Sequence, residues 1–182
     1  MNRFKFVHTT VLVLLLLSIS LVYSGCLTEG GQVEGTQTQN DENAIAAAQV
    51  GVTRETLDAI VTTAERFTER FGTFTNQDNY QNFENLKAYA TRDMQTWLAT
   101  FASEQKNDLA ATNIAFYGVT TKALTAKILT ARPDTIQILI NTKREEVTDQ
   151  SDSAKTSYQN ILIEMRRVDD DWKVQSAQFQ KT

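Results

Sequence analysis

The first half of the chain places hydrophobic residues at steps of three and four, the spacing of one face of a helix. The clearest stripe predicts a helix over 54–71, with Thr53 as its N-cap and Gly72 as a C′ residue. The apolar positions of this stripe are Leu57, Ile60, Val61, Ala64, Phe67 and Phe71. Shorter stripes predict helices over about 80–90 and 92–105, the second capped by Thr91.

The segments around these helices are less regular. An Ala-rich stretch, 45–50, predicts a short helical turn that ends at Gly51. Residues 73–79 read as a loop, and residues 106–112 as a connection that includes a further helical turn.

The pattern changes to alternation near residue 113, which predicts strands. The expected strands are 117–129, 135–148, 155–168 and 172–179. Pro133-Asp134 and the Asp169–Asp171 triplet mark tight turns, and short turns between consecutive strands favour an antiparallel meander. The chain is therefore predicted to be α+β, with N-terminal helices packed on a four-stranded antiparallel sheet whose other face is half polar.

The N-terminus has the pattern of an export signal. Arg3 and Lys5 form a basic region ahead of the apolar run Val11–Val22, which has the length of a signal-peptide core. An uncleaved membrane anchor is the alternative, because the stretch from Val7 to Tyr23 just reaches the length of a spanning helix.

The end of this signal resembles a bacterial or archaeal lipobox. In Val22-Tyr23-Ser24-Gly25-Cys26, two small residues precede a Cys directly after the apolar run, although Tyr23 stands where an aliphatic residue is usual. The resemblance implies that residues 1–25 are removed and that Cys26 carries a diacylglycerol, which would hold the chain on a membrane. The alternative reading of Cys26 is a free thiol.

The stretch after the Cys is polar and contains Gly30, Gly31 and Gly35. Such a composition buries too little apolar surface to fold. The expected organisation is a signal peptide over 1–25, a lipidated Cys and flexible tether over 26–44, and one folded domain over 45–182.

Composition excludes several classes of activity. The only His is His8, inside the leader, so the exported part lacks Ser-His-Asp, Cys-His and His-ligated metal chemistry. One Cys excludes an internal disulfide or a multi-Cys metal centre. The net charge is −4, and because the leader has no acidic residue the exported part is more acidic still, which disfavours nucleic-acid binding.

Few residues remain as candidates for chemistry. Glu164 lies mid-strand and is the best candidate for a catalytic carboxylate, but a place on the wet face of the sheet is favoured. The Asp169–Asp171 triplet lacks the spacing of a calcium loop and is expected to be a solvated turn. Trp97 and Trp172 lie on predicted buried faces, which favours a place in the core.

Helices followed by four long strands resemble the cystatin-like, nuclear transport factor 2-like superfamily. Its last strand opens with a charged turn followed by Trp, Lys and Val, as in Trp172-Lys173-Val174 here. The resemblance implies a curved sheet with helices on one face. With a membrane-targeting leader, the arrangement looks most like the envelope domains of type IV secretion and conjugation assembly factors, and Mce-associated membrane proteins share the same outline.

These observations predict a protein held on the extracytoplasmic face of a membrane by its lipid, acting without catalysis or cofactor through contacts with other envelope proteins, such as in secretion or conjugation. Two alternatives stay open. One is a lipoprotein that binds a small apolar ligand in the pocket that the resemblance implies, lined by Phe67, Phe71 and Trp97. The other is a carboxylate-dependent enzyme of the same fold.

Overall fold

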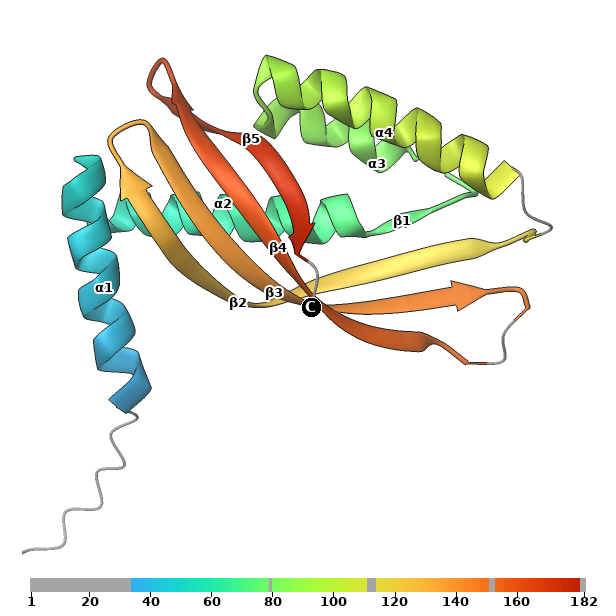
Figure 1. Cartoon of the computed structure of the whole chain (residues 1–182), viewed down its shortest axis with the longest axis horizontal. Helices are drawn as coiled ribbons and strands as arrows, with labels where there is room; N and C mark the ends of the chain where they lie inside the picture. The colour runs from blue at the N-terminus through green and yellow to red at the C-terminus, as the bar shows by residue number, and fades with distance from the viewer. Residues whose placement is uncertain (1–33, 79, 111–113, 151–152, 181–182) are drawn as a thin grey trace, which may run out of the picture. The chain divides into compact units, whose positions relative to one another are not determined.

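A computed structural model describes residues 34–78, 80–110, 114–150 and 153–180, which form one compact unit. Its elements follow the order helices, then sheet (Figure 1). They are α1 (Glu34–Val50), α2 (Arg54–Gly72), β1 (Phe74–Thr75), α3 (Gln81–Leu86), the 3-10 helix η1 (Lys87–Tyr89), α4 (Arg92–Ala110), β2 (Tyr117–Arg132), β3 (Thr135–Thr148), β4 (Lys155–Val168) and β5 (Asp171–Gln180).

The α+β prediction is confirmed. The strands lie in the order β1-β2-β3-β4-β5, every neighbouring pair is antiparallel, and the helices pack against a curved sheet (Figure 1). The sheet has one more strand than expected, because Phe74 and Thr75 pair with Val119 and Gly118 in a segment predicted as a loop.

The observed ends of β3 and β4 are the predicted ones, because strict alternation fixes which residues can face the core. The inner row of β3 consists of Ile136, Ile138 and Ile140, all fully buried. The inner row of β4 consists of Ile161, Ile163 and Met165, which are fully buried as well. The turn before β5 is tight, and Asp169 adopts a left-handed φ of 56° in it.

Helix α2 lies against this inner face. The backbone N–H of Thr56 donates to Thr53 Oγ1 at 3.2 Å, which confirms Thr53 as the N-cap. The buried face of α2 includes Leu57, Ile60, Ala64, Phe67 and Phe71, the predicted stripe.

Gly72 has a different role from the predicted one. It is the last residue of α2 and does not take a left-handed C′ conformation. A Cβ atom at this position would lie 2.7 Å from Thr121 Cβ, and Thr121 Oγ1 donates to the Gly72 carbonyl at 2.7 Å. Gly72 is therefore needed for the close approach of α2 to β2.

Helix α4 begins at its predicted cap, since the N–H of Met94 donates to Thr91 Oγ1 at 3.4 Å. It continues to Ala110, so the expected extra helical turn is present. The region predicted as one helix over 80–90 is divided into α3 and η1, and the N–H of Thr91 then donates to the carbonyl of Val174 in β5. This bond fixes the start of α4 against the last strand.

Helix α1 begins at Glu34, within the segment expected to be a flexible tether up to residue 44. For residues 34–44 that expectation is wrong. Ala46, Ala47 and Val50 are buried and anchor the second half of α1 against the domain. The polar residues before them continue the same helix, since extending a helix that is already anchored avoids the cost of nucleation. Residues 1–33, including Cys26, lie outside the described residues.

Candidate interaction surfaces

The space between α2, α4 and β5 is packed with aromatic rings. The ring centroid of Phe71 lies 5.4–6.0 Å from the centroids of Phe67, Phe83, Trp97, Phe101 and Phe179. Phe67 and Phe71 are almost fully buried. The region in which Phe67, Phe71 and Trp97 were expected to line a ligand pocket is thus filled by the protein's own side chains.

Trp97 is not in the core, contrary to its predicted place. It stacks on Phe101 with ring centroids 5.0 Å apart, and 41% of its surface is exposed. The buried stripe of α4 is formed by Met94 and Leu98 instead, so the indole lies at the margin of the helix–sheet contact. Trp172 is partly buried and packs against the core.

A small polar cluster lies on the inner face beside these rings. Arg144 Nη2 on β3 lies 3.3 Å from Glu146 Oε1, with only 13% of the Arg144 side chain exposed and 29% of that of Glu146. The guanidinium carbon of Arg144 also lies 5.8 Å from the ring centroid of Phe179. Arg144 is therefore held by an ion pair and a cation–π contact in a partly buried environment.

Tyr117 on β2 belongs to the same cluster. Burial raises the pKa of Tyr117, and the nearby carboxylate of Glu146 raises it further, whereas the charge and hydrogen bond of Arg144 lower it. Two polar atoms near this cluster, Arg144 Nε and Gln159 Oε1, are buried without a partner in the described structure. Sequence reasoning missed the cluster. Arg144 and Glu146 are two residues apart on β3, but Tyr117 lies on β2 and joins them only through the register of the two strands.

The outer face of the sheet is a ladder of polar side chains. Gln137 Nε2 donates to Glu164 Oε2 at 3.2 Å, and Asn141 Nδ2 donates to Asn160 Oδ1 at 2.9 Å across the same strand pair. Glu164 therefore lies on the face away from the helices, opposite Gln137 in the register. The best candidate for a catalytic carboxylate is in a structural hydrogen bond and does not face the aromatic interior.

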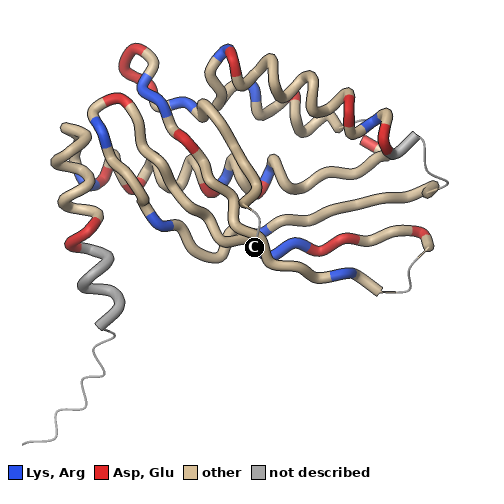
Figure 2. The backbone as a smooth tube through the Cα atoms, in the orientation of Figure 1, with Lys and Arg blue, Asp and Glu red and all other residues tan. Residues whose placement is uncertain are grey.

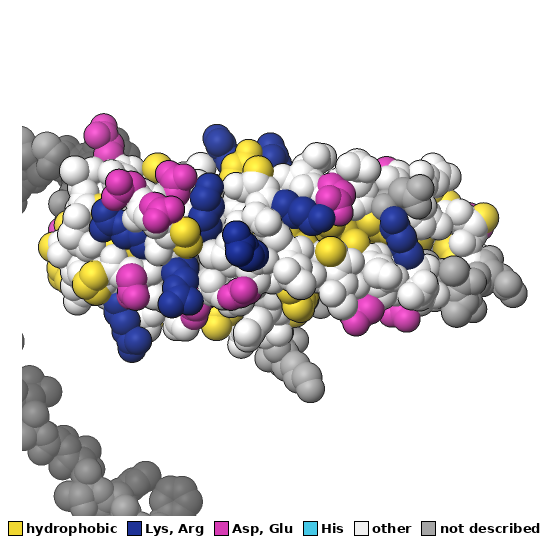
Figure 3. All heavy atoms as spheres, turned by 90° about the horizontal axis from the view of Figure 1, so that it is seen from above, with side chains coloured by type: hydrophobic (Ala, Val, Ile, Leu, Met, Phe, Trp, Pro, Cys, Tyr) yellow, Lys and Arg dark blue, Asp and Glu magenta, His cyan; other side chains and the backbone are white. Residues whose placement is uncertain are grey.

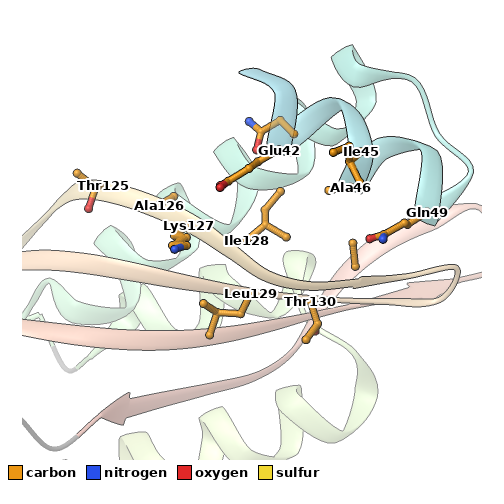
Figure 4. A pocket seen from close by; sticks show the side chains of 12 residues that line it. Glu42, Ile45, Ala46, Gln49, Thr125, Ala126, Lys127, Ile128, Leu129 and Thr130 are labelled. Atoms are coloured by element: carbon orange, nitrogen blue, oxygen red, sulfur yellow. The ribbon is translucent and has the colours of Figure 1, made fainter. Parts of the chain in front are cut away.

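Two larger hollows lie beside β2. One, of about 590 Å³, runs between α1 and the strand, where Glu42, Ile45 and Gln49 face the segment 125–131 (Figure 4). The other, of about 870 Å³, lies where the end of α2 meets β1, α3 and the start of β2. A third hollow beside Phe67 is only about 70 Å³, far below the size of a small-molecule site.

Charged residues are mixed in sign. Figure 2 shows basic and acidic residues at the hairpin turns and on the 143–146 segment of β3. Seen from above, lysine, arginine and acidic side chains intermingle without forming a patch of one sign (Figure 3). Within the described part of the chain, no group of three or more His, Cys, Asp or Glu side chains is placed to hold a metal ion. The helices in this part are also too short or too polar to cross a bilayer.

Solved structures share this arrangement. An IcmL-like type IV secretion system protein from Legionella pneumophila superposes with a TM-score of 0.54 at 14% identity, covering 68% of this chain and 91% of that one. CagV, a VirB8 homolog of the type IV secretion system from Helicobacter pylori, gives a TM-score of 0.53 at 9% identity, covering 68% of this chain and 98% of that one.

The chain has the fold of these two proteins. At 14% and 9% identity, the likeness is one of architecture. No protein-family model matches the chain, and no curated protein matches it.

Proposed function

We propose that the protein is a membrane-tethered, extracytoplasmic domain that acts without catalysis as a scaffold in a cell-envelope complex, such as a type IV secretion or conjugation assembly. The observation that carries the proposal is the fold shared with two type IV secretion proteins, in a chain whose N-terminal sequence has the pattern of an export signal followed by Cys26. In this proposal the mature chain starts at a lipidated Cys26, and the membrane and other envelope proteins are its partners.

The described surfaces support a role in protein–protein contacts more than a catalytic role. The aromatic interior is filled, Glu164 is bonded on the outer face, and the exposed surface offers a polar ladder, strand edges and shallow hollows. The mixed charge of the surface suits a protein partner better than a nucleic acid. A tether at the membrane raises the local concentration of the domain near envelope partners.

The proposal is tested by purification from membranes of the native host. The full chain, tagged at its C-terminus, is extracted in mild detergent and analysed by intact mass and by identification of co-purifying proteins. A mass without residues 1–25 and with an added lipid, together with envelope proteins in stoichiometric amount, is the expected result. A Cys26→Ser variant should lose the lipid and the membrane fraction. A chain that emerges alone in every mild detergent, or without lipid, contradicts the proposal.

A further inference from the structure

Strand β5 ends part-way along β4. Gln180 pairs with Asn160, so residues Lys155–Gln159 pair with β3 on one side only in the described structure. Figure 1 shows β4 continuing as the border of the sheet beyond the end of β5. We call these five residues the open edge of β4. Alternate backbone N–H and C=O groups along such an edge point to solvent and can pair with a further strand.

The other long border of the sheet is protected. Past its pairing with β1, strand β2 has two register shifts, between Ala123 and Thr125 and between Ile128 and Thr130. The side chain of Glu69 accepts from the N–H of Ala123 at 3.1 Å, and α1 lies over the segment 125–131 (Figure 4). Bulges and covering elements are devices that keep a strand edge from pairing with another chain.

The border formed by β5 is also interrupted. Val174 bridges to Ala90 and accepts from the N–H of Thr91, and the register shifts between Glu164 and Met165. Helix α4 then packs against β5. Contacts from the helical layer therefore restrict the approach of a partner along this strand.

In the described part of the chain, the open edge of β4 has none of these devices. Its pairing with β3 shows no register shift, and of its residues only Lys155 is charged. Tyr158 is 61% exposed on its outer side. A regular, nearly uncharged strand edge with an exposed aromatic residue has the features of a surface for strand addition.

We propose that the open edge of β4 takes up an extended segment of a partner protein as an additional antiparallel strand. The inference rests on the proposed function, since it names the surface by which the scaffold would hold an envelope partner. The added strand would continue the line of β5 along the five residues of β4 that the described part of β5 does not reach.

The inner side of the open edge favours a large apolar residue on the partner. Ser157 is the inward residue at the centre of the edge, opposite Arg144 of β3, and its small side chain leaves room beside it. The ring of Phe179, which lies opposite Ile161 near the end of β5, is 40% exposed and contacts Arg144 on one side. An aromatic side chain opposite Ser157 would pack beside the guanidinium of Arg144, which lies across β4 from it.

The charge beside this position favours an acidic residue. Lys155 lies opposite Glu146 in the register, but the carboxylate of Glu146 is paired with Arg144, and Lys155 makes no ion pair with any described residue. In an antiparallel strand, the residue two positions after the one opposite Ser157 lies opposite Lys155, on the same face. The partner segment is therefore of the form aromatic–any–acidic, in an extended run without proline.

The test uses a synthetic seven-residue peptide of threonine with phenylalanine at position three and glutamate at position five. The full chain in detergent micelles is titrated against the fluorescently labelled peptide by anisotropy, and hydrogen exchange is followed by mass spectrometry. Binding is expected to slow exchange in the segment 155–159. Lys155→Glu should weaken binding about three- to tenfold, and a peptide with lysine in place of glutamate should recover it.

Two controls separate this edge from others. Lys127→Glu, on the protected edge of β2, should leave the affinity for the peptide unchanged. Circular dichroism should show that every variant keeps the parent fold. A peptide with phenylalanine and glutamate adjacent, so that they face opposite sides, should bind more weakly. Protection at 176–180 or along β2 instead, no protection at all, or failure of the charge swap overturns the assignment of the edge. If the edge assignment fails but envelope proteins still co-purify with the chain, the proposed scaffold function is still supported.

Discussion

The Arg144–Glu146 pair is predicted to be a measurable source of stability, unlike ion pairs on the open surface. Replacing Arg144 by Met keeps the aliphatic stem beside Phe179 but removes the guanidinium. Glu146, whose side chain is only 29% exposed, is then left without its cation. Breaking a fully buried pair costs about 3–5 kcal/mol, and partial exposure lowers this, while loss of the unpaired Arg144 Nε donor offsets a further part. We expect a loss of about 2 kcal/mol in the free energy of unfolding.

The measurement is urea unfolding followed by circular dichroism, since urea is uncharged and does not screen the pair. The double variant Arg144→Met with Glu146→Gln should recover stability to within about 1 kcal/mol of the parent protein, because no charge is then left unpaired. The neighbouring pair on the same strand supplies a matched control. Lys143 Nζ lies 2.6 Å from Glu145 Oε1 with both side chains well exposed, so Lys143→Met should leave the unfolding midpoint unchanged.

Two outcomes would contradict a stabilising role for the Arg144–Glu146 pair. Arg144→Met could unfold at the same urea concentration as the parent protein. This would mean that the partly buried pair contributes no more to stability than an ion pair on the surface. Alternatively, the double variant could be as unstable as the single one, which would trace the loss to packing against Phe179 and not to the orphaned carboxylate.

Three further predictions test the fold. Gly72→Ala should lower the free energy of unfolding by about 1–3 kcal/mol, because its Cβ would collide with Thr121. If the site tolerated the Cβ, alanine would stabilise the protein through its higher helix propensity, so urea unfolding should distinguish a loss from a gain in stability. The pKa of Tyr117 is raised in the folded state, so its contribution to stability is present below about pH 10 and is lost as the pH rises through the folded-state value; Tyr117→Phe should flatten the alkaline decline of the thermal midpoint. Phe71→Ala should cost about 3–5 kcal/mol and Trp97→Ala much less, since only the first is fully buried; comparable losses in urea would contradict this division of the aromatic cluster.

Most strands of the sheet could be predicted from the sequence. In β3 and β4, alternate residues are buried isoleucine or methionine, and a shift of one position would expose them all, so the pattern specified both strands and their ends. The caps at Thr53 and Thr91 were predictable for a similar reason, because each is a local hydrogen bond between residues three apart.

Features that depend on distant residues could not be predicted. The role of Gly72 depends on Thr121, which is far along the chain, and the exposure of Trp97 depends on how far α4 reaches over β5. Tyr117 joins the Arg144–Glu146 pair of β3 only in the register that pairs β2 with β3. Helix propensity in a polar segment is a weak guide, which is why the early start of α1 was missed.

The open edge of β4 combines both kinds of information. Its sequence, with one charge in five residues, is ordinary for a strand whose two sides are paired, and alternation alone gives no sign that one side is free. Among the described residues, the pairing with β5 extends along β4 only as far as Asn160. The open edge of β4 has the composition of an interior strand but lies at a border of the sheet, so it can accept another strand. At β2, the bulges and the covering helix α1 oppose such pairing. The two borders of one sheet are thus treated differently, and a scaffold that binds by strand addition needs such an asymmetry, because two equally open edges would favour uncontrolled self-association.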